Sequence, residues 1–136
     1  MKTFTPEMQA RLAELLTKFK LPTFSTEVVK RFAAAGHDSA LPTLLEVLEA
    51  EADERGQRRT ERLLKAARLP PGKTFETLDR ARVPRQIMLK LDELATGDFV
   101  ERADNVLCFG LPGRGKTHAA AALGHALVQR GFSVLF

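Results

Sequence analysis

The sequence contains no tryptophan and no tyrosine, so nine phenylalanines are its only large aromatic side chains. Surfaces that bind single-stranded nucleic acid stack the bases on exposed aromatic rings. These phenylalanines mostly lie within apolar patterns, so we expect any nucleic-acid contact to be made mainly to phosphates. A single cysteine, Cys108, excludes a disulfide within the chain. Its apolar surroundings are typical of a buried thiol in a reducing compartment.

Long hydrophobic runs are also missing. No apolar run approaches the roughly 18 residues that a membrane-spanning helix needs, and the first residues lack the apolar stretch of a secretory signal. The sequence therefore predicts a cytoplasmic protein with no membrane partner. Its 136 residues, 44% hydrophobic and 28% charged, suit one ordinary globular domain or two small ones.

Positive charge is concentrated in one stretch of the chain. Residues 1–54 hold 6 Lys and Arg against 9 Asp and Glu, whereas residues 55–90 hold 11 against 3. The second stretch includes cations at helical spacings of three and four, which places them on one helix face. These candidate DNA contacts are Arg55, Arg58, Arg59, Arg62 and Lys65. Such a row favours DNA phosphates through counterion release. The alternative is a solvated face paired with acids such as Glu51 and Glu54.

Proline-containing turns divide the first half of the sequence into helical stretches. Apolar residues recur at helical spacing within them, which predicts helices over about residues 6–21, 25–36 and 43–68. The break at Pro70-Pro71-Gly72 ends the last helix. We therefore expect an all-α N-terminal helical region over residues 1–72, and a connector with one helix over residues 73–104.

The last part of the sequence has the order strand, loop, helix, strand. An unbroken apolar run at residues 105–110 is typical of a strand covered on both faces in a parallel sheet. An alanine-rich helix follows to about Arg130, and residues 132–136 suit a second strand. Residues 105–136 are therefore predicted to begin an α/β P-loop NTPase core, with the chain ending before the core is complete.

A complete GxxxxGK[ST] phosphate-binding motif lies between the first expected strand and the helix. With the histidine that follows it, the motif gives these candidate nucleotide contacts: Gly110, Leu111, Pro112, Gly113, Arg114, Gly115, Lys116, Thr117 and His118. The glycines let the backbone curl so that N–H groups point at phosphate beside the positive end of a helix dipole. Lys116 is expected to reach the β- and γ-phosphates of ATP, and Thr117 to offer its hydroxyl to nucleotide-bound Mg²⁺.

The motif alone leaves simpler interpretations open. The loop could be a glycine-rich turn that only allows close packing, and Arg114 is expected to face solvent. His118 and His125 can lie at the helix surface or at a contact with another element, because neither has a Cys or carboxylate at metal-binding spacing.

Six stretches agree with one known family. They are residues 51–59, 64–70, 73–76, 105–106, 110–118 and 122–124. They resemble the IstB/DnaC group of AAA+ ATPases, most closely the IstB helper ATPases of insertion-sequence transposition, and the resemblance covers nearly all of the chain. The sequence departs from the family pattern around Asp79, where Leu78 and Arg80 replace an aromatic pair.

The resemblance implies an activity that this sequence carries only in part. It implies ATP and Mg²⁺ binding at the loop, DNA contact, a transposase partner and homo-oligomers in full-length members. The family's Walker B acids, sensor residues and arginine finger, which hydrolysis needs, follow the part that this chain resembles. We therefore expect a fragment that binds ATP without hydrolysing it alone and that tends to associate. A DnaC-like helicase loader and a catalytically inactive regulatory fragment are the alternatives.

Overall fold

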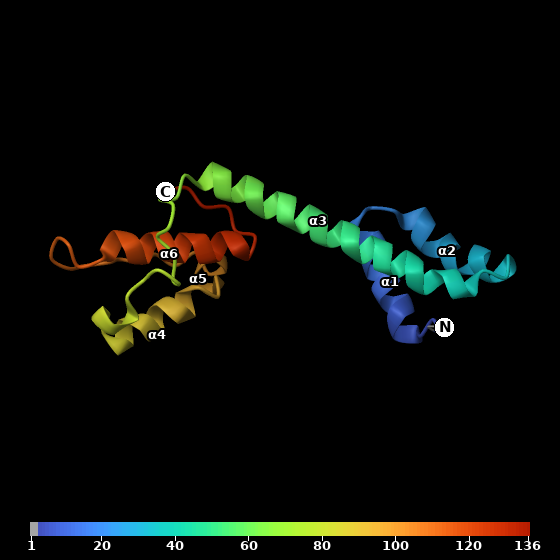
Figure 1. The fold of residues 1–136 in the computed structure, drawn as a ribbon, viewed down its shortest axis with the longest axis horizontal. Coiled ribbons are helices and arrows are strands. Elements are labelled where there is room, and N and C mark those ends of the chain that lie inside the picture. The colour runs from blue at the N-terminus through green and yellow to red at the C-terminus, as the bar shows by residue number, and fades with distance from the viewer. Residues whose placement is uncertain (1–2) are drawn as a thin grey trace. The chain divides into compact units, whose positions relative to one another are not determined.

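The computed structural model of the protein describes residues 3–136 as helices joined by turns and extended segments (Figure 1). The elements in chain order are α1 Pro6–Lys18, α2 Pro22–Ala34, the short 3-10 helix η1 Asp38–Ala40, α3 Leu41–Ala67, the short 3-10 helix η2 Arg80–Arg82, α4 Arg85–Leu94, α5 Asp98–Glu101 and α6 Lys116–Gln129. The chain divides into two compact units, residues 1–57 and residues 58–136. No helix within residues 3–136 combines the length and apolar character needed to cross a membrane.

The first two helices both begin at a proline. Pro6 opens α1, and the Thr5 hydroxyl accepts a hydrogen bond from the Met8 N–H at 3.2 Å. Proline suits this position because its fixed φ is helical and the missing N–H would have no partner within the helix. Pro22 opens α2 in the same way without a side-chain cap. The helix therefore begins before Ser25, where the sequence predicted its start.

The unit of residues 1–57 has one apolar core to which three helices contribute. Leu12, Leu15 and Leu16 recur at helical spacing on α1, and at most 1% of each is exposed. The buried residues of this core are Leu12, Leu15, Leu16, Val28, Leu41, Leu45 and Ala52. Phenylalanines and other partly buried apolar residues pack around it. The prediction of an all-α N-terminal region is confirmed.

The unit of residues 58–136 buries smaller groups of residues. α4 packs against α6, and both helices bury apolar residues at helical spacing. The buried apolar residues of these two helices are Met88, Leu91, Leu94, Ala121, Ala122, Leu127 and Val128. Val128 also clusters with Ala67 and Leu69. α6 is therefore the helix around which this unit is assembled.

Glycine at position 97 lets the chain turn tightly after α4. Gly97 has φ 86°, and a Cβ built there would overlap the ring of Phe132. Residues other than glycine are strained at such a φ. The turn therefore requires glycine both for its backbone conformation and for the close approach of Phe132.

The two predicted strands are absent. Residues 104–111 and 132–136 are extended, but no strand occurs anywhere within residues 3–136. A strand exists only where its N–H and C=O groups pair with a neighbouring backbone, and no backbone hydrogen bond joins these two segments. The Phe136 N–H instead donates to the Ala67 carbonyl at 2.9 Å. The predicted α/β P-loop core of strand, loop, helix and strand is therefore wrong.

The apolar run before the loop lies on the surface. Leu107 is 77% exposed and Phe109 is 86% exposed. Cys108 between them is an exposed free thiol, so the prediction that it is buried is also wrong. The apolar pattern predicts a segment that suits burial, but it cannot supply the neighbouring strands that would cover it.

Candidate phosphate loop and basic helix face

Two glycines give the loop of residues 110–117 its shape. Gly113 has φ 75° and Gly115 has φ 84°, both in the left-handed region that favours glycine. Gly110 does not share this conformation, and a Cβ added there would make only ordinary contact with the Lys116 side chain. The structure thus gives a backbone reason for two of the three glycines of the motif.

The loop leads directly into the 14-residue helix α6. Gly115 is the N-cap residue of α6, and no side chain there accepts a hydrogen bond from the first turn. The first N–H groups of a helix have no partner within the helix, and they carry the positive end of its dipole. The start of α6 is therefore a position where an anion is favoured.

Lys116 folds back over the loop. Its Nζ donates to the Gly110 carbonyl at 2.6 Å and to the Leu111 carbonyl at 2.8 Å, and its side chain is half-buried. An ammonium group has three donors, so these two bonds leave one donor free. The lysine therefore places a positive charge inside the loop, where the motif predicts it.

The remaining loop side chains face outward. Leu111, Pro112, Arg114 and Thr117 are all exposed. Within residues 3–136, neither the Arg114 guanidinium nor the Thr117 hydroxyl has a hydrogen-bond partner. The same residues contain no cluster of three His, Cys, Asp or Glu that could hold a metal ion. A magnesium ion at this loop would therefore have to arrive with other oxygen ligands.

Two histidines of α6 contact the connector that precedes α4. His118 Nε2 lies 3.1 Å from the Thr74 carbonyl and 3.2 Å from Thr77 Oγ1. His125 Nε2 lies 3.1 Å from the Pro70 carbonyl. Both rings are half-buried. Their place at a contact between two elements agrees with one of the two positions that the sequence analysis left open for them.

A pocket of about 350 Å³ lies beside the loop. Connector residues form one wall of the pocket, and the loop with the start of α6 forms the other. The lining residues are Leu78, Asp79, Arg82, Val83, Gly113, Arg114, Gly115 and His118. Sequence reasoning placed only the last four of these at the site. The sequence analysis had singled out Leu78 only as a departure from the family pattern, and it gave no signal for the connector wall.

The predicted basic face is exposed, but some of its charges are already engaged. Arg55 pairs with Glu51, and its guanidinium lies 4.4 Å from the centre of the Phe19 ring. Arg59 donates to the Gly131 carbonyl at 3.4 Å. Arg62 and Lys65 have no hydrogen-bond or ion-pair partner within the described part of the chain. The alternative of a face paired with acids therefore holds for Arg55, and DNA contact by the row stays a prediction.

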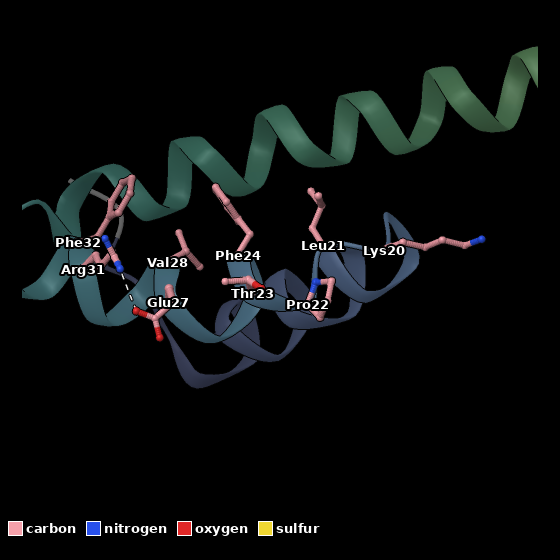
Figure 2. A pocket seen from close by; sticks show the side chains of 9 residues that line it. All are labelled: Lys20, Leu21, Pro22, Thr23, Phe24, Glu27, Val28, Arg31 and Phe32. Carbon is pink, nitrogen blue, oxygen red and sulfur yellow. Dashed lines mark hydrogen bonds and ion pairs between the residues drawn. The ribbon is translucent and has the colours of Figure 1, made fainter.

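A larger groove of about 510 Å³ lies along α2 in the other unit. Figure 2 shows Phe24 and Phe32 of α2, and Leu21 just before it, projecting on the side where α3 runs. The charged groups that border the groove are Lys20 and the Arg31–Glu27 ion pair. None of the predicted site residues lines it. Its apolar character does not suit a phosphate ligand.

Comparison with known proteins gives one consistent result. Residues 14–136 match the family described as IstB-like ATP binding protein. An insertion sequence ATP-binding protein of Sinorhizobium fredii is 40% identical over 132 residues, which are 94% of this chain and 44% of the relative. The insertion sequence IS5376 ATP-binding protein of Geobacillus stearothermophilus is 32% identical over 131 residues, 95% of this chain and 52% of the relative.

A third relative agrees with these two. The insertion sequence IS21 ATP-binding protein of Pseudomonas aeruginosa is 39% identical over 127 residues, 92% of this chain and 48% of the relative. The chain therefore spans about half the length of the curated relatives it matches.

Proposed function

Because the chain belongs to the family of IstB-like ATP binding proteins, we propose that the loop of residues 110–117 binds the phosphates of ATP. The observation that carries the proposal is the junction between the loop and α6. There Gly113 and Gly115 turn the backbone, the first turn of α6 has no side-chain cap, and Lys116 adds a positive charge. These are the features that bind phosphate at a helix N-terminus.

The side chains of the loop suit a nucleotide that carries Mg²⁺. Lys116 would hold the terminal phosphates, and the exposed Thr117 hydroxyl would offer an oxygen to the metal. Mg²⁺ is usually held by one or two protein oxygens together with phosphate oxygens and water. The absence of a carboxylate cluster within residues 3–136 is consistent with this arrangement. When bound, Mg²⁺ would neutralise part of the triphosphate charge.

The pocket beside the loop would receive the rest of the nucleotide. Its volume of about 350 Å³ falls within the range of small-molecule sites. Arg114 and the Arg82–Asp79 pair line it, so its charged groups can meet the polar atoms of a ribose or a phosphate. Gly113 and Gly115 belong to both the pocket and the loop, which makes one continuous site.

The test compares the whole chain with its Lys116→Ala variant by titration calorimetry with Mg-ATP. A hydrogen bond to a charged group contributes about 1.5–3 kcal/mol, so the variant should bind about 10- to 100-fold more weakly. Lys90→Ala is the matched control, because Lys90 is exposed and pairs with Glu93 on α4. Circular dichroism of each variant checks that helix content is retained. Equal affinity of wild type and Lys116→Ala would show that the loop does not bind ATP.

ATP binding without hydrolysis by this chain alone is part of the same proposal. Hydrolysis requires a carboxylate for Mg²⁺, a group that orients water and usually an arginine from a neighbour. In the family, these groups follow the part that this chain resembles. Phosphate release, measured in the same samples, should stay at the level of a protein-free control.

A second proposal concerns DNA. Arg62 and Lys65 are exposed cations without protein partners within residues 3–136, and they lie in the most basic stretch of the sequence. We propose that they contact DNA phosphates. Arg55 should contribute less, because Glu51 and the Phe19 ring already hold its guanidinium.

Salt-dependent binding to duplex DNA tests this second proposal. Each lost phosphate contact lowers the slope of log affinity against log salt by about 0.9, so the double variant Arg62→Ala/Lys65→Ala should lower it by up to about twice that amount. The control is Arg31→Ala, since Arg31 is exposed but pairs with Glu27. An unchanged slope in the double variant would remove these residues from the interface.

The wider role follows from the relatives and is also a proposal. The relatives are named as ATP-binding proteins of insertion sequences, so we assign this chain to transposition, where a transposase and further copies of the chain would be its partners in the cytoplasm. Co-purification with the transposase encoded by the same element, with and without Mg-ATP, tests this assignment. Absence of nucleotide-dependent association would argue against it.

A further inference from the structure

His118 follows the phosphate loop directly, but its ring faces the connector. The Nε2 atom lies 3.1 Å from the Thr74 carbonyl and 3.2 Å from Thr77 Oγ1. A carbonyl oxygen only accepts hydrogen bonds, so the Nε2 atom must carry the proton that is shared with Thr74. The first turn of α6 is thereby tied to a segment 44 residues earlier in the sequence.

The segment that His118 holds is a compact hydrogen-bonded turn. The Thr77 hydroxyl donates to the Gly72 carbonyl and accepts from the Thr74 N–H at 3.0 Å. The Leu78 N–H donates to the Thr74 carbonyl at 3.1 Å. One carbonyl oxygen, that of Thr74, therefore accepts from both His118 and Leu78. Loss of the imidazole removes one of the two donors at the centre of the turn.

The turn leads directly into a wall of the pocket beside the loop. Leu78, whose N–H closes the turn, lines that pocket together with Asp79, and Gly113 and Gly115 lie on its other side. Within residues 72–78 Gly72, Glu76 and Thr77 are exposed and the other residues are only partly buried, so burial alone does not fix this turn. Segments of this kind open at low free energy. The position of the wall should therefore depend on the few hydrogen bonds that hold the turn.

We propose that His118 is a positioning residue that couples phosphate binding at the loop to the order of the connector turn at residues 72–78. This inference rests on the proposed ATP site. Phosphate at the loop orders the first turn of α6, and His118 passes that order to Thr74, Thr77 and the pocket wall. Coupling between two sites is reciprocal. If ATP binding favours the ordered turn by a certain factor, the ordered turn favours ATP binding by the same factor. Loss of the His118 contact should therefore lower the affinity for ATP.

His125 supplies an internal comparison. It lies seven residues after His118, on the same face of α6, and contacts the Pro70 carbonyl at 3.1 Å. It does not line the pocket beside the loop. Loss of His125 should therefore loosen the start of the connector while leaving ATP affinity nearly unchanged.

The experiment measures Mg-ATP affinity and amide hydrogen exchange on the whole chain and on its variants. His118→Ala should weaken Mg-ATP binding about 3- to 10-fold, the effect of one lost hydrogen bond of ordinary strength, and should speed exchange at the Thr74 and Leu78 amides. His118→Gln should restore both properties, because the glutamine amide nitrogen can donate from nearly the same place. Thr77→Val removes the hydroxyl at constant shape and should reproduce His118→Ala. The double variant His118→Ala/Thr77→Val should have nearly the same ATP affinity and amide exchange as each single variant.

Exchange with and without Mg-ATP separates the two proposals. In the wild type, Mg-ATP should slow exchange at Thr74 and Leu78, and in His118→Ala this protection should be lost even at saturating nucleotide. Protection that persists in His118→Ala, or a glutamine variant as defective as the alanine variant, would overturn the coupling. A wild type that does not bind Mg-ATP would overturn the proposed function together with the coupling. In that case, amide exchange that is faster in nucleotide-free His118→Ala than in the nucleotide-free wild type would still show that the imidazole holds the turn.

Discussion

Two apolar stretches of the chain differ sharply in burial. Leu15 and Leu16 of α1 are 1% and 0% exposed, whereas Leu107 and Phe109 before the loop are 77% and 86% exposed. A helix satisfies its own backbone hydrogen bonds, so α1 needs only an apolar partner surface to become buried. An extended segment needs a neighbouring backbone as well. An apolar pattern therefore predicts burial more safely for a helix than for a strand.

The largest effect should come from the core of residues 1–57. Leu16→Ala leaves a cavity at a position with no solvent exposure and should lower the free energy of unfolding by about 2–5 kcal/mol. The measurement is thermal and urea unfolding followed by circular dichroism, because the chain has no Trp or Tyr for fluorescence. Val47→Ala is the control, since Val47 is 62% exposed and should cost less than about 0.5 kcal/mol. Similar losses in the two variants would contradict the core assignment.

The next largest effect should come from the close approach of Gly97 and the Phe132 ring in the unit of residues 58–136. Gly97→Ala combines strain at a φ of 86° with overlap of its Cβ and the Phe132 ring, and should cost about 1–3 kcal/mol in unfolding. Gly72→Ala carries similar strain at a φ of 75°, but its Cβ would meet nothing within 4 Å. The difference between the two variants measures the contact with Phe132. Equal losses would mean that backbone strain alone explains both.

A smaller effect is expected at the exposed apolar segment. Phe109→Ser should change the free energy of unfolding by less than about 0.5 kcal/mol, because the side chain is 86% exposed. It should also reduce self-association, since exposed apolar side chains promote it. Sedimentation velocity at several concentrations checks the second outcome. A loss as large as that of Leu16→Ala would show that Phe109 is buried in solution, and the contrast between the two stretches would disappear.

The smallest effect concerns pH. The pKa of Glu76 lies below its ordinary value, chiefly because the Thr74 hydroxyl hydrogen-bonds to the carboxylate and then because its own backbone N–H does so. Arg80 and His125 add weaker attraction. A carboxyl group with a lowered pKa in the folded state stabilises the fold above its unfolded-state pKa of about 4.3. That stability is lost as the pH falls through the folded-state pKa.

Glu76→Gln should therefore lower the thermal midpoint slightly near neutral pH, where ionised Glu76 stabilises the fold. The midpoint of the variant should fall less below about pH 4.3, so that the two proteins converge in acid. Thermal unfolding across an acidic pH series measures this difference. Glu101→Gln serves as the control, because Glu101 is an exposed carboxyl on α5. Parallel pH curves for wild type and Glu76→Gln would remove Glu76 from the acid response.

Local features of the structure could be read from the sequence. Short spacings determine the helical stretches, the place of the phosphate motif before α6 and the row of basic residues. α2 begins earlier than the predicted residue 25, because Pro22 opens the helix without a side-chain cap. These properties reside in neighbouring residues, and sequence patterns report them directly.

Contacts between distant segments could not be read in the same way. No spacing rule links His118 to Thr74 or places Leu78 in the pocket beside the loop. The strand predictions failed for a related reason, since residues 105–110 have the composition of a buried strand but no adjacent backbone. Contacts between distant segments depend on the packing of the whole fold, and spacings within one sequence do not specify that packing.

The position of the Lys116 ammonium bears on which anions the proposed phosphate loop would prefer. Its two carbonyl contacts, at 2.6 and 2.8 Å, leave one ammonium donor free. They would have to be weakened or exchanged before all three donors could face a ligand. Chloride offers no oxygen in exchange for those carbonyl dipoles, and a single sulfate offers fewer oxygens than a triphosphate. A triphosphate brings several anionic oxygens at once. In the proposed ATP site, the resting lysine would therefore act as a threshold that favours ligands of dense negative charge over common small anions.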